Sequence, residues 1–181
     1  MKSETISSIP KSKLTLPIGG RDHIQGPIDA PITLLEYGDY ECPYCGAAYP
    51  IIKEVQQQLG DRLCFAFRNF PLVNSHPHAQ HAAEAAEAAS AQGRYWEMHD
   101  LLFEHQEALE DENLTQYAAD LELDTRRVMA EVRAGEHLAR VREDFHSGAR
   151  GGVNGTPTCF VNGVCFTGRT NVEDLLAALT Q

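Results

Sequence analysis

Apolar residues follow two different spacings along this chain. Near both ends they form short continuous runs of strand length, whereas in the middle they recur at the three- and four-residue spacing of helices. The predicted strands are residues 31–37, 62–68, 158–161 and 164–167. The predicted helices are residues 45–59, 78–92, 95–106, 113–121, 125–134, 136–147 and 172–179.

Local turn and capping residues support these boundaries. Asn162-Gly163 between the last two strands is the strongest short-range signal for a two-residue hairpin turn. Asp124 or Thr125 can cap the helix that runs to residue 134, and Asn171 can cap the final helix. The glycines at 148, 151 and 152 are expected to end the helix that starts at residue 136.

The order of these elements predicts an α/β fold. The first strand, helix and second strand form a βαβ unit, whose crossover should be right-handed and whose strands should be parallel. The last two strands form an antiparallel hairpin followed by a helix. This arrangement is the thioredoxin fold with an inserted α-helical domain. We expect an N-terminal extension over 1–21, the thioredoxin-fold domain over 22–74 and 150–181, and the insert over 75–149.

Length and charge narrow the possible functions. The 181 residues correspond to one ordinary domain, and a hydrophobic content of 43% with 23% charged residues is globular. The net charge of -11 argues against nucleic acid or an anionic membrane surface as a partner. Residues 84–144 contain 16 acidic and 6 basic side chains, so this helical block holds almost all of the excess negative charge. It is most simply a solvated surface.

The five cysteines need an explanation, because a chain of this length buries enough surface to need no disulfide. No stretch has the length of a secretory signal or the ~20 apolar residues of a membrane span. These features favour the cytoplasm, where a cysteine pair is more often catalytic or metal-binding than structural. An exported protein whose leader has been removed is the alternative.

Cys42-Pro43-Tyr44-Cys45 follows the first strand and opens the next helix. At a helix amino terminus, unpaired N–H groups and the helix dipole lower a thiol pKa from about 8.5. Cys42 is therefore the expected nucleophile, and Cys45, one turn further, would resolve the mixed disulfide. The alternative is half of a zinc site. It is disfavoured because the sequence has no second CxxC motif.

The chain also resembles the DsbA-like thiol:disulfide oxidoreductases over roughly residues 22–180. The matching segments are 36–45, Pro50, 76–78, 94–100 and 152–158. The resemblance implies dithiol–disulfide exchange with protein dithiol or disulfide substrates and a redox partner. It implies no cofactor, and we expect a monomer without a metal site, nucleic-acid binding or membrane insertion.

The resemblance also gives roles to further residues. It implies that the Thr156–Pro157 peptide bond is cis and exposes the Thr156 backbone to a substrate strand, with Pro43 and Tyr44 on the same substrate surface. It also implies that Glu36 is a buried carboxyl that exchanges a proton with Cys45. Without the resemblance, residues 155–157 would be interpreted as an ordinary turn. Glu36 would be interpreted as a strand-end carboxylate near solvent or paired with Lys53.

The other candidates have simpler interpretations. Cys64, Cys159 and Cys165 are expected in the core. Cys159 and Cys165 should point to opposite sides of the sheet, which excludes a disulfide between them. A minor hypothesis makes Cys159, two residues past Pro157, a third redox thiol.

Histidines and aromatic residues of the middle segment have structural interpretations as well. The histidines at 76, 78 and 81 are expected at the start of a helix rather than at a metal. Tyr95, Trp96, Leu102 and Phe103 are expected to form the core of the insert.

The sequence thus predicts a protein disulfide oxidoreductase in which Cys42 attacks, Cys45 resolves and Glu36 transfers the proton. The Pro-Tyr dipeptide between the cysteines resembles that of glutaredoxins, whose reduction potentials are about -200 to -230 mV. We therefore expect an enzyme of intermediate reduction potential that works in both directions. The alternatives are a non-catalytic polypeptide-binding module and a redox sensor that acts through a partner.

Overall fold

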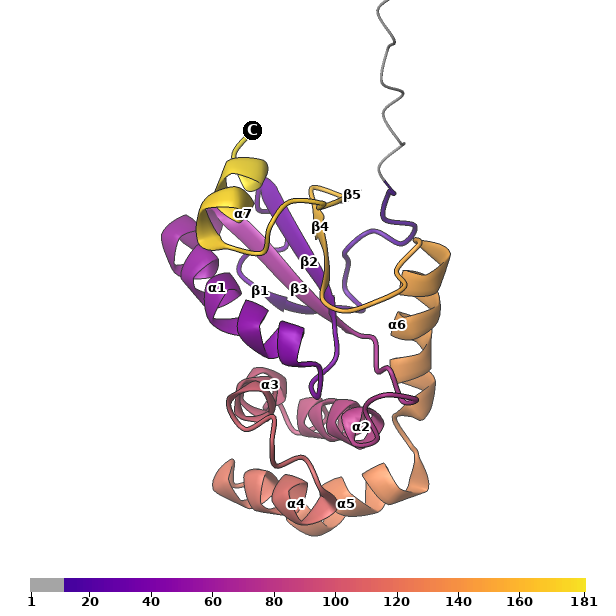
Figure 1. The fold of residues 1–181 in the computed structure, drawn as a ribbon. Helices are drawn as coiled ribbons and strands as arrows, with labels where there is room; N and C mark the ends of the chain where they lie inside the picture. The colour runs from indigo at the N-terminus through magenta and orange to yellow at the C-terminus, as the bar shows by residue number, and fades with distance from the viewer. Residues whose placement is uncertain (1–11) are drawn as a thin grey trace, which may run out of the picture.

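The computed structural model describes residues 12–181 and is built around a five-stranded sheet (Figure 1). The strands lie in the order β1-β3-β2-β4-β5, with β2 and β3 parallel and the other pairs antiparallel. Their bounds are β1 His23–Gln25, β2 Ile32–Gly38, β3 Leu63–Asn69, β4 Thr158–Val161 and β5 Val164–Cys165. The parallel β2–β3 pair and the antiparallel hairpin confirm the predicted thioredoxin fold.

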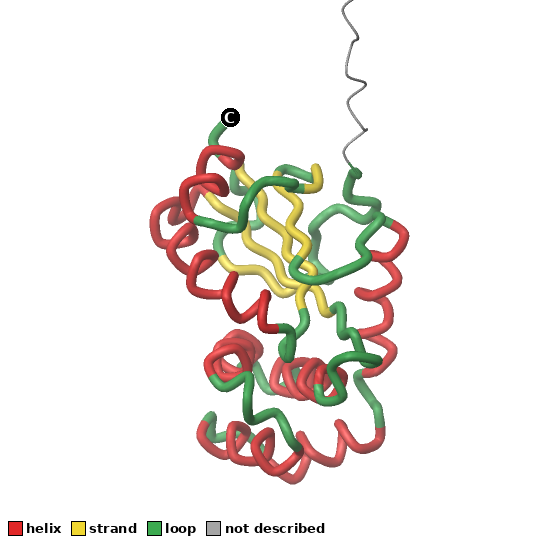
Figure 2. Tube along the Cα trace, in the orientation of Figure 1, coloured by secondary structure: helices red, strands yellow, loops and turns green. Residues whose placement is uncertain are grey.

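Helices cover both faces of this sheet and one of its ends. Helices α1 and α7 lie on one face, α6 lies on the other, and α2 to α5 lie beyond the end of the sheet where α1 begins (Figures 1 and 2). Their bounds are α1 Pro43–Leu59, α2 Ala79–Ser90, α3 Tyr95–Glu104, α4 Asp111–Asp120, α5 Thr125–Ala134, α6 Leu138–Arg150 and α7 Val172–Leu179, with a 3-10 turn over Gly60–Arg62.

Alternation along β2 sends successive side chains to opposite faces of the sheet. Leu34 belongs to the apolar cluster on the α1 side, whereas Leu35 and Tyr37 belong to the cluster on the other face. Glu36 has the same parity as Leu34, so its carboxyl lies on the α1 side. This alternation places a charged residue beneath the start of α1.

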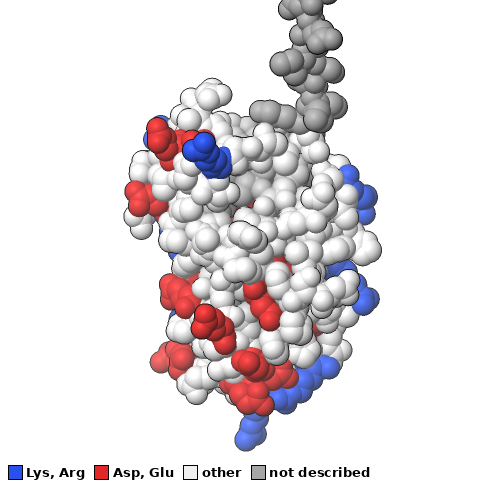
Figure 3. All heavy atoms as spheres, viewed as in Figure 1, with Lys and Arg blue, Asp and Glu red and all other residues white. Residues whose placement is uncertain are grey.

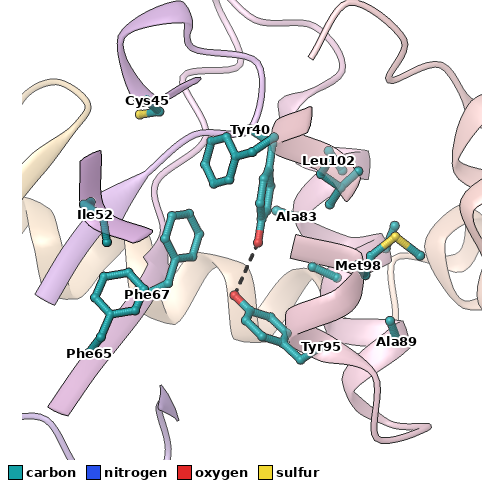
Figure 4. Packing of buried hydrophobic residues seen from close by; sticks show 14 of the residues in the cluster. Tyr40, Cys45, Ile52, Phe65, Phe67, Ala83, Ala89, Tyr95, Met98 and Leu102 are labelled. Carbon is teal, nitrogen blue, oxygen red and sulfur yellow. Dashed lines mark hydrogen bonds between the residues drawn. The ribbon is translucent and has the colours of Figure 1, made fainter. Parts of the chain in front are cut away.

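The core on the α1 side continues into the helices α2 to α5. Tyr40 lies between the sheet and α3, close to Phe67 (Figure 4), and its ring packs against those of Phe67 and Phe103. Its hydroxyl lies 3.4 Å from that of Tyr95, on α3. Met98, Leu102 and the alanines of α2 from Ala82 onward belong to the same buried cluster. The sheet and the helical segment formed by α2 to α5 therefore share one hydrophobic core.

Several predicted turns and caps are confirmed. Asp124 accepts a hydrogen bond from the Arg127 N–H at 3.1 Å, and Asn171 accepts one from the Asp174 N–H at 2.8 Å. Asn162 and Gly163 have φ values of 47° and 77°, and Val161 pairs with Val164 across the two-residue turn. Positive φ at both positions is the reason this turn favours Asn-Gly.

The structure departs from the predicted elements at the end of α6, at the end of β5, which stops at Cys165 instead of residue 167, and at β1. The helix expected to end before Gly148 continues through it, so α6 reaches Arg150. A Cβ on Gly148 would lie 2.9 Å from ring atoms of both Tyr37 and Phe70, so this glycine provides close packing of α6 against the sheet. The edge strand β1, paired with β3, was not predicted because three residues are too few to show alternation.

Acidic side chains gather on the side of the molecule formed by the helices beyond the sheet (Figure 3). Several basic side chains lie beside them at the far end, so the negative charge is interrupted on the face shown. Among residues 12–181, no helix is both long and apolar enough to cross a membrane.

Candidate redox-active site

The CxxC motif lies where β2 passes into α1. Cys42 is the N-cap of α1 with extended φ and ψ of -74° and 120°, and Pro43 occupies the first turn. The Cys42 carbonyl accepts hydrogen bonds from the N–H groups of Cys45 and Gly46, at 3.0 and 3.1 Å. Proline suits this position because its missing N–H has no partner in the first turn. The motif therefore starts the helix with the Cys42 thiol at its amino terminus.

The pKa values of the two thiols of the motif are shifted in opposite directions. A hydrogen bond from Cys45 is the largest influence on Cys42, and burial opposes it. Together with a contribution from Thr156 and the N–H groups of Cys45 and Tyr44, this bond lowers the Cys42 pKa to about 5. Burial, followed by the bond to Cys42 and the charge of Glu36, raises the Cys45 pKa far above its usual range. Cys42 is therefore a thiolate at neutral pH and Cys45 a thiol.

The loop before β4 lies against Cys42. The Thr156–Pro157 peptide bond is cis, and the Cys42 Sγ is 3.4 Å from the Thr156 carbonyl oxygen. Tyr44, next to the cysteines, is 74% exposed and Pro43 is also exposed. The structure therefore brings together the loop and the motif, which lie more than 110 residues apart in the chain.

Glu36 is buried beneath the motif, with 2% of its surface exposed. Its Oε1 has no hydrogen-bond partner among the described residues. Burial, with a smaller contribution from Cys42, raises the Glu36 pKa to about 8. The alternative of a carboxylate near solvent is wrong because Glu36 is buried, and the alternative of a pair with Lys53 is wrong because Lys53 contacts Asp100 at 2.6 Å instead.

Sequence analysis missed Asp39, which organises the loop before Cys42. Its carboxylate accepts hydrogen bonds from the Glu41 N–H, the Leu72 N–H and His76 Nδ1, at 2.8, 2.8 and 2.7 Å. Its own N–H donates to the Cys45 Sγ at 3.5 Å. Asp39 thus joins the motif to the segment after β3. Its place three residues before Cys42 was the only available signal.

Two histidines of the middle segment each contact a carboxylate. His76 contacts Asp39, and His81 contacts Asp111 at 2.7 Å. No group of three potential ligands of the His, Cys, Asp or Glu type comes together within residues 12–181. Burial lowers the His76 pKa, but Asp39 outweighs it, and the net shift is upward.

The remaining cysteines lie in or beside the core as expected. Cys64 is fully buried and Cys159 is 6% exposed. Cys165 pairs with Phe160, so its side chain and that of Cys159 point to opposite faces of the sheet. A disulfide between them is excluded, as the hairpin register predicts. Cys159 lies on the same face as Cys45, and it is the cross-strand partner of Glu36 in the pairing of β2 with β4.

The βαβ-ββα sheet, the CxxC turn and the adjacent Thr156–Pro157 loop are together the features of a thioredoxin-fold protein. A family model described as thioredoxin matches residues 19–181. The chain belongs to this family.

Solved structures share this fold over nearly the whole chain. BdbD from Bacillus subtilis superposes with a TM-score of 0.81 at 22% identity, over 95% of this chain and 98% of that one. A thioredoxin-like oxidoreductase from Silicibacter pomeroyi gives 0.79 at 24% identity, over 90% and 92%. Alpha-DsbA1 from Wolbachia pipientis gives 0.77 at 19% identity, over 92% of each chain. Similarity at these identities establishes the fold.

Curated relatives with higher identity are much longer proteins. The chain is 46% identical over 160 residues to a protein named Na(+)/H(+) antiporter NhaA 1 from Salinispora arenicola, covering 88% of this chain and 24% of that one. A protein of the same name from Mycobacterium sp. strain KMS is 45% identical over 161 residues, covering 88% and 26%. The chain spans about a quarter of the length of these relatives.

Proposed function

We propose that this protein exchanges disulfides with protein substrates through Cys42 and Cys45. The Cys42 thiolate attacks one sulfur of a substrate disulfide, and the other substrate sulfur leaves as a thiolate. Cys45 then attacks the Cys42 sulfur and releases the second substrate thiolate. The substrate gains two electrons, and the protein is left with a Cys42–Cys45 disulfide. The same steps in reverse oxidise a substrate dithiol.

The opposite pKa shifts of Cys42 and Cys45, one helical turn apart, are the observation that supports this proposal. A low pKa gives Cys42 the thiolate that attacks, and a high pKa keeps Cys45 protonated until the mixed disulfide has formed. Cys45 must then lose its proton. Glu36 lies on the same side of the sheet, and the Cys42 charge contributes to its raised pKa of about 8. Because that charge is lost when Cys42 is bonded to substrate, the ionised Glu36 carboxylate is the proposed acceptor.

The proposed substrate surface surrounds Cys42. The Thr156 backbone beside the Cys42 Sγ would pair with an extended substrate segment, and Pro43 and Tyr44 would contact the side chains that flank the substrate cysteine. The exposed ring of Tyr44 offers apolar area without charge. Such a surface suits many unfolded or flexible polypeptides, including both substrates and a redox partner.

The Cys42 pKa of about 5 also bears on whether the protein oxidises or reduces its substrates. A more stable thiolate favours the reduced protein and makes its disulfide more oxidising. Thioredoxin, with a pKa of about 7, has a potential near -270 mV, and DsbA, with about 3.5, has one near -120 mV. An intermediate pKa therefore supports an intermediate potential and exchange in both directions.

Turnover with purified substrates tests the proposal. We expect reduction of insulin by the dithiol form and oxidation of reduced ribonuclease by the disulfide form, both abolished in Cys42→Ser. Cys45→Ala should accumulate the mixed disulfide with substrate. Cys64→Ala removes a buried thiol on the other face and should retain activity. Full activity in Cys42→Ser, or polypeptide binding without turnover in the wild type, would contradict an exchange enzyme.

The cytoplasmic location and the monomeric state are further proposals. Alkylation of rapidly acidified cells reports whether the Cys42–Cys45 pair is held reduced, as a reducing compartment requires. A fully oxidised pair in cells would contradict the cytoplasm. Light scattering of the purified protein measures its mass, which we expect to equal the 20.0 kDa of one chain.

A further inference from the structure

Gln106 reaches the CxxC turn from the helical segment. It lies in the loop between α3 and α4, and its Nε2 donates hydrogen bonds to the carbonyl oxygens of Tyr40 and Cys42, at 2.7 and 2.9 Å. Both carbonyls belong to the short stretch that joins β2 to α1. One side-chain amide thus connects two points of the turn that carries the nucleophile.

Tyr40 is fixed to the same helical segment at its other end. Its side chain is 1% exposed, packs against Phe103 and meets the Tyr95 hydroxyl (Figure 4). Residues of α3 therefore hold its ring while Gln106 holds its carbonyl. Because Tyr40 is two residues before Cys42, the start of the turn has little freedom to move independently of the helices.

Gly46 leaves the space that the Gln106 amide fills. A Cβ built on Gly46 would lie 1.8 Å from the Gln106 Oε1 and 2.5 Å from its amide carbon. Gly46 lies inside α1, where glycine is unfavourable relative to alanine. The close approach of Gln106 explains why a glycine occupies this helical position.

We propose that Gln106 is a positioning residue that sets the reactivity of Cys42, an inference that rests on the proposed function. The Cys42 thiolate is stabilised by the Cys45 thiol and by N–H groups of the first turn of α1, and these donors point at the sulfur only while the turn keeps its shape. Gln106 holds the carbonyl side of that turn. The helical segment thereby contributes directly to the nucleophile, although it supplies no group that touches substrate.

The thiolate of Cys42 provides a readout that does not depend on turnover. Its ultraviolet absorbance against pH gives the pKa, and iodoacetamide gives the rate of attack. We expect Gln106→Ala to raise this pKa and slow alkylation at pH 5 by up to about tenfold, the equivalent of one lost hydrogen bond. Gln106→Glu should act more strongly, because a carboxylate oxygen replaces the donor that faces the two carbonyls.

Gly46→Ala provides a second, independent approach to the same contact. Its Cβ should displace the amide and reproduce the effect of Gln106→Ala. In the Gln106→Ala background the space is empty, so the added methyl group should have no further effect on Cys42. This coupling in a double-mutant cycle distinguishes the contact from two unrelated losses of stability. Gln116→Ala, an exposed glutamine of α4 bonded to Asp120, is the matched control and should leave the pKa unchanged.

An unchanged Cys42 pKa in folded Gln106→Ala would overturn the inference, as would additive effects of Gln106→Ala and Gly46→Ala. Circular dichroism confirms that each variant is folded before it is titrated. The two proposals fail separately. A wild-type protein without exchange activity would contradict the proposed function, whereas the titrations and alkylation rates still measure the effect of Gln106 on Cys42.

Discussion

Glu36 and Cys159 lie directly opposite each other in the antiparallel pairing of β2 with β4. Opposite residues of such a pair project to the same face, so the carboxyl and the thiol share the buried space on the α1 side. Burial, with a smaller effect of Glu36, raises the Cys159 pKa well above its ordinary value. Cys159 is therefore a protonated neighbour of the proposed proton acceptor.

Glu36→Gln should change how the stability of the reduced protein depends on pH. A carboxyl whose pKa rises from 4.5 to about 8 on folding binds more protons in the folded state, so the wild type loses stability as pH increases between these values. The loss between pH 4.5 and 7 is on the order of 3 kcal/mol. Glu36→Gln should lack it. Urea unfolding at both pH values measures the difference, and equal pH dependence in the two proteins would refute the buried, neutral carboxyl.

Substitutions of Cys159 should separate a redox role from an effect on Glu36. Cys159→Ala should retain exchange activity, which would eliminate Cys159 as a third redox thiol. Cys159→Ser places a hydroxyl opposite the unpartnered Oε1 of Glu36, where it can stabilise the carboxylate and lower its pKa. We expect the pH profile of turnover to shift to lower pH in the serine variant only, by about one unit. Identical profiles for the two variants would argue against Glu36 as the proton acceptor.

Alkylation kinetics should show the unequal acidity of the two active-site thiols. Cys42 should react with iodoacetamide with a midpoint near pH 5, while Cys45 stays unreactive at neutral pH. The hydrogen bond from Cys45 is the largest cause of the low pKa, so Cys45→Ala should raise the midpoint by about one unit or more. Cys45→Ser retains a donor and should raise it less. Equal midpoints in all three proteins would mean that the helix terminus alone sets the acidity of Cys42.

The sequence predicted the elements whose pattern is local. The apolar runs, the CxxC turn and Asn162-Gly163 each depend on a few consecutive residues, and the structure places them as expected, except that the last strand ends at Cys165 instead of residue 167. The boundary of α6 was wrong because Gly148, a helix-ending residue by local rules, packs against Tyr37 and Phe70 from distant parts of the chain. Tertiary packing outweighed local preference there.

The active-site surroundings were predicted only where a motif marked them. Cys42, Cys45 and the Thr156–Pro157 loop could be named from the sequence, but Gln106 could not. A glutamine in an acidic loop has no distinguishing signal, and its bonds to carbonyl oxygens depend on no particular residue at positions 40 and 42. Gly46 was the one local clue, since a glycine inside a helix often marks a close approach.

A buried ion pair on the other face of the sheet should contribute to stability without affecting the active site. Arg68 and Asp22 have fully buried side chains, and the guanidinium donates two hydrogen bonds to the carboxylate, at 2.8 and 3.0 Å. The same guanidinium donates to the carbonyls of Leu16 and Pro17, so it also fixes the segment that precedes β1. Removing one partner of a buried pair leaves the other charge without compensation.

Asp22→Asn should therefore destabilise the protein by about 3–5 kcal/mol at neutral pH, measured by urea unfolding. Burial raises the Asp22 pKa, but the bonds and charge of Arg68 outweigh it, and the net shift is downward. The contribution of the pair is thus present above the ordinary value of 3.8 and lost as pH falls through the lower folded-state value, so wild type and variant should converge in acid. Arg68→Met combined with Asp22→Asn should cost less than Asp22→Asn alone, because no charge remains buried. The Cys42 pKa should not change in any of these variants, since Arg68 projects to the α6 side; a shift would mean that the two faces of the sheet are coupled.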